Sequence, residues 1–371
     1  MLLMNTRKLL LIFLFFIPST ILAQLNLSVH GYLNQAYAFT DGKSIFGITK
    51  DGTTDYRHLA LQFRNDVDES NVFIIQLSHR REGNSPEMQF HDDVELDWAY
   101  FEHRFSENFS IKIGKIQLPL GIYSEIRDVG VLLPFYQIPY MPYGESSYMS
   151  ETIDGFSFKH TLPLSDNSSI ESDLFVGQWR WIEWEIIDFA GSNQLLIAES
   201  IVNKAMGLRI WYYTPFEDLS IGFTGLTGSV TDGINFSKDG LLGKQQLLAG
   251  NISIDLTKES FFFRTEHMVA SLQNDKLWGY NFYAQMGFNI TTYLNINSQF
   301  TYFHLNNLPE FNIDVDYYKD SALGIKYSFN PQLIFKAEYH LNESFIVQEP
   351  VNFTKSPPRV QYGIISVSTS F

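Results

Sequence analysis

The most constraining feature of this sequence is the alternation of apolar and polar residues over many long segments. In "LIFKAEYHL", residues 333–341, the odd positions are all apolar or aromatic, whereas Lys336, Glu338 and His340 occupy even positions. Successive side chains of a β-strand point to opposite faces, so this period of two predicts a strand with two unlike faces. Segments such as "WGYNFYAQMGF" and "SALGIKYSF" alternate in the same way. We therefore expect an all-β fold.

The alternating segments are long for a soluble sheet. They run for about 9–14 residues, whereas strands of soluble proteins average about 5–6 residues and membrane-spanning strands about 9–11. Aromatic residues make up 16% of the chain, and they gather at segment ends such as "RIWYYTP" and "LDWAYFEH". Membrane barrels carry aromatic girdles at such positions. The pattern favours a transmembrane antiparallel β-barrel over the alternative, a soluble β-sandwich or propeller.

About sixteen strands are predicted, an even number, as in single-chain bacterial barrels. The expected strands are 25–39, 58–66, 70–81, 93–105, 108–118, 152–161, 168–178, 199–214, 217–228, 244–256, 258–271, 276–289, 292–304, 317–329, 331–343 and 360–371. Long links, expected on the outer side, are 40–57, 82–92, 119–151, 179–198, 229–243 and 344–359. The links between them are short, which fits periplasmic turns. The first strand should pair with the last, because an open barrel edge cannot be satisfied in lipid.

The first 23 residues are predicted to be a secretory signal peptide. Arg7 and Lys8 precede the apolar run "LLLIFLFFIPST", and a small residue, Ala23, ends a plausible cleavage site. The alternative, a membrane anchor, is disfavoured because a spanning helix needs about 20 apolar residues. Residues 24–371 are then expected to form a single barrel domain in the bacterial outer membrane. The last strand ends on Phe371, which is typical of proteins inserted by the barrel-assembly machinery, so this machinery and outer-membrane lipids are expected partners.

Composition argues against several other classes of protein. The formal net charge is −15, which disfavours nucleic-acid binding, since that needs clustered Lys and Arg. The chain contains no Cys, so disulfides, thiolate metal sites and Cys nucleophiles are excluded. None of the nine His lies in a recognisable nucleophile motif, and no GxGxxG, P-loop or HExxH motif is present. We therefore expect no catalytic residue, no cofactor and no metal site.

One segment does not fit the strand pattern. "GKIQLPLGIYSEIRDVGVLLPFYQIPYMPYGE", residues 114–145, begins as a strand but contains four prolines and many apolar residues. Irregular backbone at membrane depth is tolerated only where it is buried in protein or lines a water-filled cavity. We predict that this third outer loop folds into the barrel and narrows the pore through Tyr123, Glu125, Arg127, Asp128, Tyr136, Tyr140, Tyr143 and Glu145. Its charges are expected to have few partners, because the rest of the segment is apolar. The alternative is a packed surface loop at the outer rim.

Strand parity predicts which charged side chains face the lumen. The basic set is Arg64, Arg80, Lys112, Arg209, Arg264, Lys326, Lys336 and His340, and the acidic set is Glu95, Asp97, Glu171, Asp173, Glu266 and Glu338. An Arg or Lys facing lipid at the bilayer midplane would cost ~2–4 kcal/mol, which favours inward placement. The slight basic surplus predicts a weak preference for anions. Alternatively, these charges pair with one another, as Arg264 with Glu266 and Lys336 with Glu338, and only brace the wall.

The segment "IKIGKIQLPLGIYSEIRDVG", the Pro/Tyr stretch after it and "ETIDGFSF" together resemble sixteen-stranded Gram-negative outer-membrane porins. The similarity is greatest to the broad group around phosphate-selective porins O and P, and Gly114, Lys115, Pro119 and Gly121 match the strand end that leads into their inward third loop. The resemblance implies a trimeric, water-filled channel for small hydrophilic solutes or ions. The chain departs from a phosphate channel because it lacks a dense ladder of arginines. The alternatives are a structural or surface-receptor barrel and an outer-membrane hydrolase.

Overall fold

The structure is a computed structural model of the chain. It describes residues 26–89, 91–144, 150–189, 192–216, 218–232, 245–272, 277–308 and 313–371. The predicted signal peptide and Glu145 lie outside these residues. Within the described ranges, no helix is both long and apolar enough to cross a bilayer.

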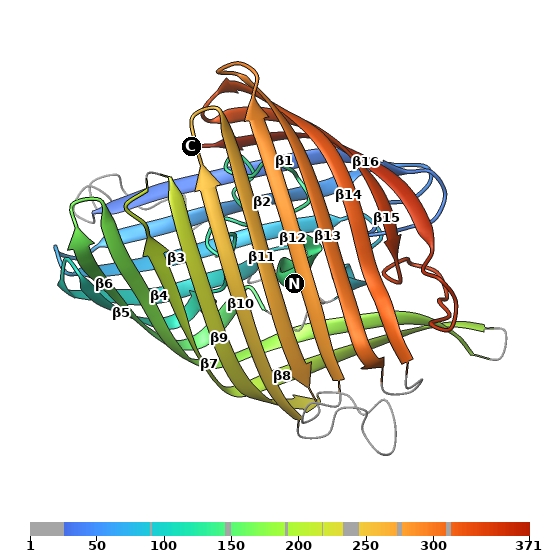
Figure 1. Cartoon of the computed structure of the whole chain (residues 1–371), viewed down its shortest axis with the longest axis horizontal. Helices are drawn as coiled ribbons and strands as arrows, with labels where there is room; N and C mark the ends of the chain where they lie inside the picture. The colour runs from blue at the N-terminus through green and yellow to red at the C-terminus, as the bar shows by residue number, and fades with distance from the viewer. Residues whose placement is uncertain are drawn as a thin grey trace, which may run out of the picture.

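Sixteen antiparallel strands form a closed barrel in the described part of the chain (Figure 1). They are β1 (Leu27–Thr40), β2 (Thr53–Asp66), β3 (Asn71–Glu82), β4 (Glu95–Ser106), β5 (Phe109–Gln117), β6 (Thr152–Ser165), β7 (Ser168–Phe189), β8 (Ser192–Tyr213), β9 (Leu219–Asp232), β10 (Gln245–Thr257), β11 (Phe261–Leu272), β12 (Leu277–Asn289), β13 (Leu294–Leu308), β14 (Ile313–Asn330), β15 (Leu333–Ser344) and β16 (Arg359–Ser370). Each strand pairs with its sequence neighbours, and β1 pairs with β16. The predicted fold class is confirmed.

The barrel closes without an exposed strand edge. β1 and β16 are in register from Tyr32 opposite Ser370 to Thr40 opposite Tyr362. Alternate residues point outward, and the outward set is apolar, as Leu33, Phe73 and Ile75 illustrate. An outward apolar band on a closed barrel suits a bilayer, because all backbone groups are satisfied between strands.

The predicted long link at 179–198 is wrong. β7 and β8 are each 22 residues long, and they remain paired from Trp179 opposite Val202 to Phe189 opposite Ser192. Figure 1 shows this yellow-green hairpin extending beyond its neighbours. The segment "WRWIEWEII" is rich in Trp and Ile, which favour strands, so the hairpin continues past the expected turn. β2 likewise begins at Thr53, earlier than predicted.

Four loops fold into the lumen at the end of the barrel that carries the long loops. The loop from 118 to 151 contains the short helix α3 (Tyr140–Tyr143), and the loop after β3 contains the 3₁₀ helix η1 (Pro86–Gln89). Ile45 of the 41–52 loop forms a bridge with Val347 of the 345–358 loop. The ring of Phe46 packs against those of Tyr140 and Tyr318 at 5.4 and 6.4 Å. The inward course of the third outer loop, predicted from its prolines and apolar residues, is thus part of the fold.

Candidate channel constriction

The inward loop, residues 118–151, is built from consecutive turns. Backbone hydrogen bonds run from Ile126 to Tyr123, from Val129 to Ile126 and from Leu132 to Val129, with the first-named residue donating its N–H. Such turns leave many carbonyl and N–H groups without partners in the loop. These groups need partners elsewhere, because buried backbone polar groups are almost always hydrogen-bonded. The barrel wall supplies them at four places.

The first attachment is a hydroxyl and carboxylate cluster on β11 and β12. Tyr143 and Tyr283 both donate their hydroxyls to the Glu266 carboxylate, the second at 2.7 Å. The Ile122 N–H donates to the Tyr143 hydroxyl at 2.8 Å and to Glu266 Oε1 at 3.2 Å. Arg264 Nη1 donates to the Tyr123 hydroxyl at 3.2 Å. The beginning and the end of the loop are therefore held at one wall position.

The second attachment joins Glu125 of the loop to Arg209 of β8. Arg209 Nη2 lies 2.9 Å from Glu125 Oε1 and 2.7 Å from Asp173 Oδ2. One guanidinium therefore forms ion pairs with a loop carboxylate and with a wall carboxylate. Arg209 and Asp173 are buried, whereas the Glu125 side chain is 47% exposed. Lys159 completes this wall cluster through Glu171, at 2.8 Å.

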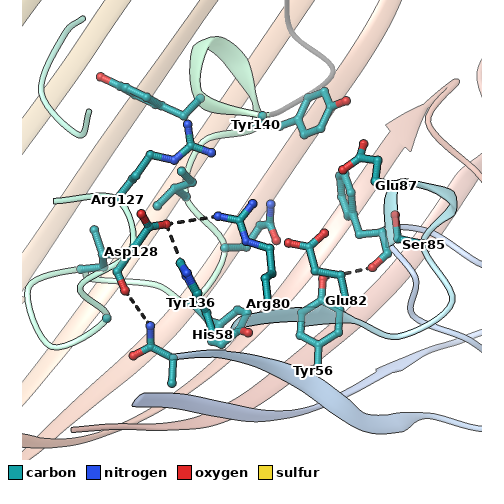
Figure 2. Close-up of a pocket in the computed structure, with 18 of the residues that line it drawn as sticks. Tyr56, His58, Arg80, Glu82, Ser85, Glu87, Arg127, Asp128, Tyr136 and Tyr140 are labelled. Atoms are coloured by element: carbon teal, nitrogen blue, oxygen red, sulfur yellow. Dashed lines mark hydrogen bonds and ion pairs between the residues drawn. The ribbon is translucent and has the colours of Figure 1, made fainter. Parts of the chain in front are cut away.

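The third attachment centres on Asp128 and faces β1 to β3. Arg80 Nη2 and His58 Nδ1 both lie 3.3 Å from Asp128 Oδ1, and Asn34 donates its amide to the Asp128 carbonyl at 2.8 Å (Figure 2). Arg127 Nε and Glu151 Oε2 are 4.0 Å apart. Burial and the neighbouring Asp128 carboxylate raise the pKa of Glu151 to about 7. The protonation of Glu151 therefore sets the charge of this part of the loop near neutral pH.

The fourth attachment binds loop residues 130–137 to β13, β14 and β15. Lys336 Nζ donates to the Gly130 and Phe135 carbonyls at 2.9 and 3.0 Å, and Lys326 Nζ donates to the Val131 carbonyl at 2.8 Å. The Glu338 carboxylate accepts the N–H groups that follow, from residue 136 at 2.6 Å and residue 137 at 3.0 Å. Wall cations thus bind loop carbonyls and a wall carboxylate binds loop N–H groups.

The structure places the remaining wall charges as follows. Among the basic residues, Arg64 pairs with Asp66 at 2.7 Å, Lys112 lies over the Tyr100 ring at 5.2 Å, and His340 pairs with Asp320 at 2.8 Å. Among the acidic residues, Glu95 contacts His91 at 3.0 Å and Asp97 accepts the Gln76 amide at 2.9 Å. Within the loop, the Tyr136 ring packs at a tilt against that of Tyr56 at 5.5 Å, and the Tyr140 ring stacks on that of Tyr318 at 5.2 Å.

Neither of the two within-strand pairs considered as an alternative, Arg264 with Glu266 and Lys336 with Glu338, is formed. Arg264 takes Asp255 of the adjacent strand as its carboxylate partner, at 3.2 Å, while Glu266 binds hydroxyl and amide groups. Lys336 and Glu338 likewise bind loop backbone. The described loop charges were expected to have few partners, but Glu125, Arg127 and Asp128 each lie near an opposite charge. Sequence reasoning missed the wall contributions of His58, Asp255 and Tyr283, although strand parity would have placed all three inward.

A cavity of about 110 Å³, the outer cavity, lies between this loop and the wall, beside the long loops that are expected to face outward. Figure 2 shows Arg127 and Asp128 on one side of it and Glu82 and Glu87 on the other, with Arg80 between them. Aromatic side chains and Lys336 also line the cavity. Charges of both signs therefore line this cavity. Among the described residues, no cluster of three or more His, Asp or Glu side chains is arranged to hold a metal ion.

The fold is similar to that of solved outer-membrane proteins. Salmonella typhi OmpF, solved as a complex with daunomycin, matches with a TM-score of 0.63 at 12% identity over 93% of this chain and 97% of that chain. OmpT of Vibrio cholerae matches with a TM-score of 0.59 at 11% identity over 93% and 97%. The anion-selective porin of Comamonas acidovorans matches with a TM-score of 0.58 at 8% identity over 94% and 100%. No protein-family model and no curated protein matches the sequence. The architecture is that of a bacterial outer-membrane β-barrel of the porin kind.

Proposed function

We propose that this chain is an outer-membrane porin, a channel for passive diffusion of small hydrophilic solutes or ions. The observation that carries the proposal is the inward loop, because its four attachments lie on strands all around the barrel. A loop held in this way narrows the lumen and presents charged groups to any solute that crosses. The proposal assigns no catalytic step to the chain, and it takes the assembled form to be a homotrimer in outer-membrane lipid.

A weak preference for anions is part of the proposal. Arg80, Arg209 and Arg264 each face a carboxylate, which offsets their charge. Lys326 instead donates to the uncharged Val131 carbonyl oxygen, so its positive charge is less offset than that of the three arginines. Rings and ladders of charge at a constriction bias which ions enter. The basic surplus is small, so we expect the preference to be modest.

Deletion of Ile122–Pro142 tests the constriction. The wall keeps its own hydrogen-bond ladder, so the barrel should still fold, as heat-modifiable mobility on a gel would report. In planar lipid bilayers the single-channel conductance should rise clearly, and ion selectivity should weaken. A matched charge variant, Arg127→Glu, should keep the conductance and shift the reversal potential in a salt gradient toward cations. A folded deletion variant with unchanged conductance would exclude this loop as the constriction.

A further inference from the structure

A second cavity, of about 230 Å³, lies on the other side of the inward loop. Leu132 and Pro134 of the loop form part of its lining, together with Phe262 and Arg264 of β11, Lys326 of β14 and Tyr293. Tyr293 belongs to the short turn between β12 and β13, and short turns mark the periplasmic end of such barrels. This cavity therefore opens into the periplasmic half of the lumen.

Two cations that line the cavity have hydrogen-bond donors with no partner among the described residues. A guanidinium carries five N–H groups, and Arg264 uses one toward Asp255 and one toward the Tyr123 hydroxyl. An ammonium carries three, and Lys326 uses one toward the Val131 carbonyl. Among the described residues that line the cavity, none is an Asp or a Glu. The remaining donors suit a negatively charged group.

The two sides of the loop differ in charge. Lys326 and Lys336 lie directly opposite each other on β14 and β15, yet Lys336 lines the outer cavity and Lys326 lines the periplasmic one. The outer cavity also contains Glu82, Glu87 and Asp128. Carboxylates in the lining offset the cations of the outer cavity, whereas the charged residues that line the periplasmic cavity, Arg264 and Lys326, are both cationic. We therefore expect the periplasmic cavity to distinguish anions from cations more strongly than the outer cavity does.

The apolar part of the lining narrows the chemical class. The Arg264 guanidinium lies over the Phe262 ring at 5.1 Å, and Leu132 is 52% exposed despite being a leucine. An inorganic oxyanion would make no use of Phe262, Leu132 and Tyr293. An organic anion would place its charged end between the two cations and its apolar body against these side chains, which removes apolar surface from water.

We propose that this periplasmic cavity is a binding site for small organic carboxylates. The carboxylate lies between Arg264 and Lys326, and the apolar or aromatic body of the solute lies against Phe262, Tyr293 and Leu132. Asp255 offsets part of the Arg264 charge, which keeps binding weak, as a channel site requires for the solute to leave. The inference rests on the proposed porin function, since it assigns a solute class to that pore.

Binding of 4-fluorobenzoate to the purified barrel, followed by ¹⁹F NMR in detergent micelles, tests the site without measuring transport. We expect saturable binding of 4-fluorobenzoate. Excess benzoate should displace it, and inorganic phosphate at the same concentration should displace much less of it. Lys326→Gln should weaken binding about tenfold, because a charge-assisted contact is lost. Lys326→Arg should restore most of it. Phe262→Ala should weaken binding of the aromatic anion as well.

The matched control is Lys258→Gln, which makes the same charge change at an exposed turn between β10 and β11. It should bind 4-fluorobenzoate as the unchanged protein does. Equal binding by Lys326→Gln and Lys258→Gln, with both barrels folded, would overturn the site. If phosphate displaced 4-fluorobenzoate as strongly as benzoate does, the assignment to organic carboxylates would be overturned. A barrel that conducts in bilayers but fails this test refutes only the site, whereas one that never conducts refutes the porin function.

Discussion

Lys326 of β14 and Lys336 of β15 are directly opposite each other in the sheet, and both donate hydrogen bonds to carbonyl oxygens of the inward loop. Neighbouring cations repel one another, so this placement needs a compensating interaction. Three loop carbonyls, from residues 130, 131 and 135, provide it. The relationship explains how an irregular loop can lie at a fixed depth in the lumen, because its buried carbonyls are satisfied by the wall.

Removing one lysine should loosen the loop while the barrel stays folded. Lys336→Met leaves two buried carbonyl oxygens without their donor, which costs about 1–3 kcal/mol for each group. A spin label at Leu132→Cys, the sole cysteine in such a protein, should become more mobile in electron paramagnetic resonance spectra. The control is Lys319→Met on the exposed side of β14. Identical label mobility in the two variants would contradict the role of Lys336.

Arg209 should contribute more to stability than its loop partner. Arg209→Leu leaves the buried Asp173 carboxylate unpaired, and breaking a buried ion pair costs about 3–5 kcal/mol. Glu125→Gln removes a half-exposed carboxylate, which costs under about 1 kcal/mol. The midpoint of urea unfolding should therefore fall far more for Arg209→Leu. Adding Asp173→Asn to Arg209→Leu should recover part of the lost stability. If the double variant is no more stable than Arg209→Leu, the unpaired Asp173 carboxylate is not the cause of the destabilisation.

Ion selectivity should depend on pH near neutrality. The pKa of Glu151 is raised to about 7, so this carboxyl is mostly protonated at pH 6 and mostly ionised at pH 8. Ionisation adds a negative charge beside Asp128, Arg127 and Arg80. The reversal potential in a salt gradient should then move toward cations as the pH rises from 6 to 8. Glu151→Gln should remove most of this dependence, and an unchanged pH dependence in that variant would place its origin elsewhere.

The direction of the barrel in the membrane can be tested with single cysteines. Ser44→Cys and Lys355→Cys lie in the long loops 41–52 and 345–358, and both should react with an impermeant maleimide on intact cells. Ser165→Cys and Asn330→Cys lie at short turns and should react only after the outer membrane is opened. Labelling of the second pair on intact cells would reverse the assignment of outer and periplasmic ends.

The sequence alone determined the number of strands and the closed barrel. Alternation is a local signal, since each residue's face follows from its neighbours two positions away, and lipid demands closure because no strand edge can be left unsatisfied. The inward course of the loop was also predictable. Its prolines make the backbone too irregular to face lipid, and its many apolar residues disfavour a loop that extends into water.

Only the tertiary structure decided which groups meet inside the barrel. Arg264 pairs with Asp255 rather than with Glu266 on its own strand, and Glu266 instead holds Tyr143, which is far away in the sequence. The alternation of residues along a strand predicts which side of the barrel wall a side chain faces. It contains no information on the register between strands or on the depth of the loop. The extension of β7 and β8 beyond the expected turn depends in the same way on pairing between two strands. Partners across a barrel are set by register and curvature, which are properties of the closed sheet and not of any single segment.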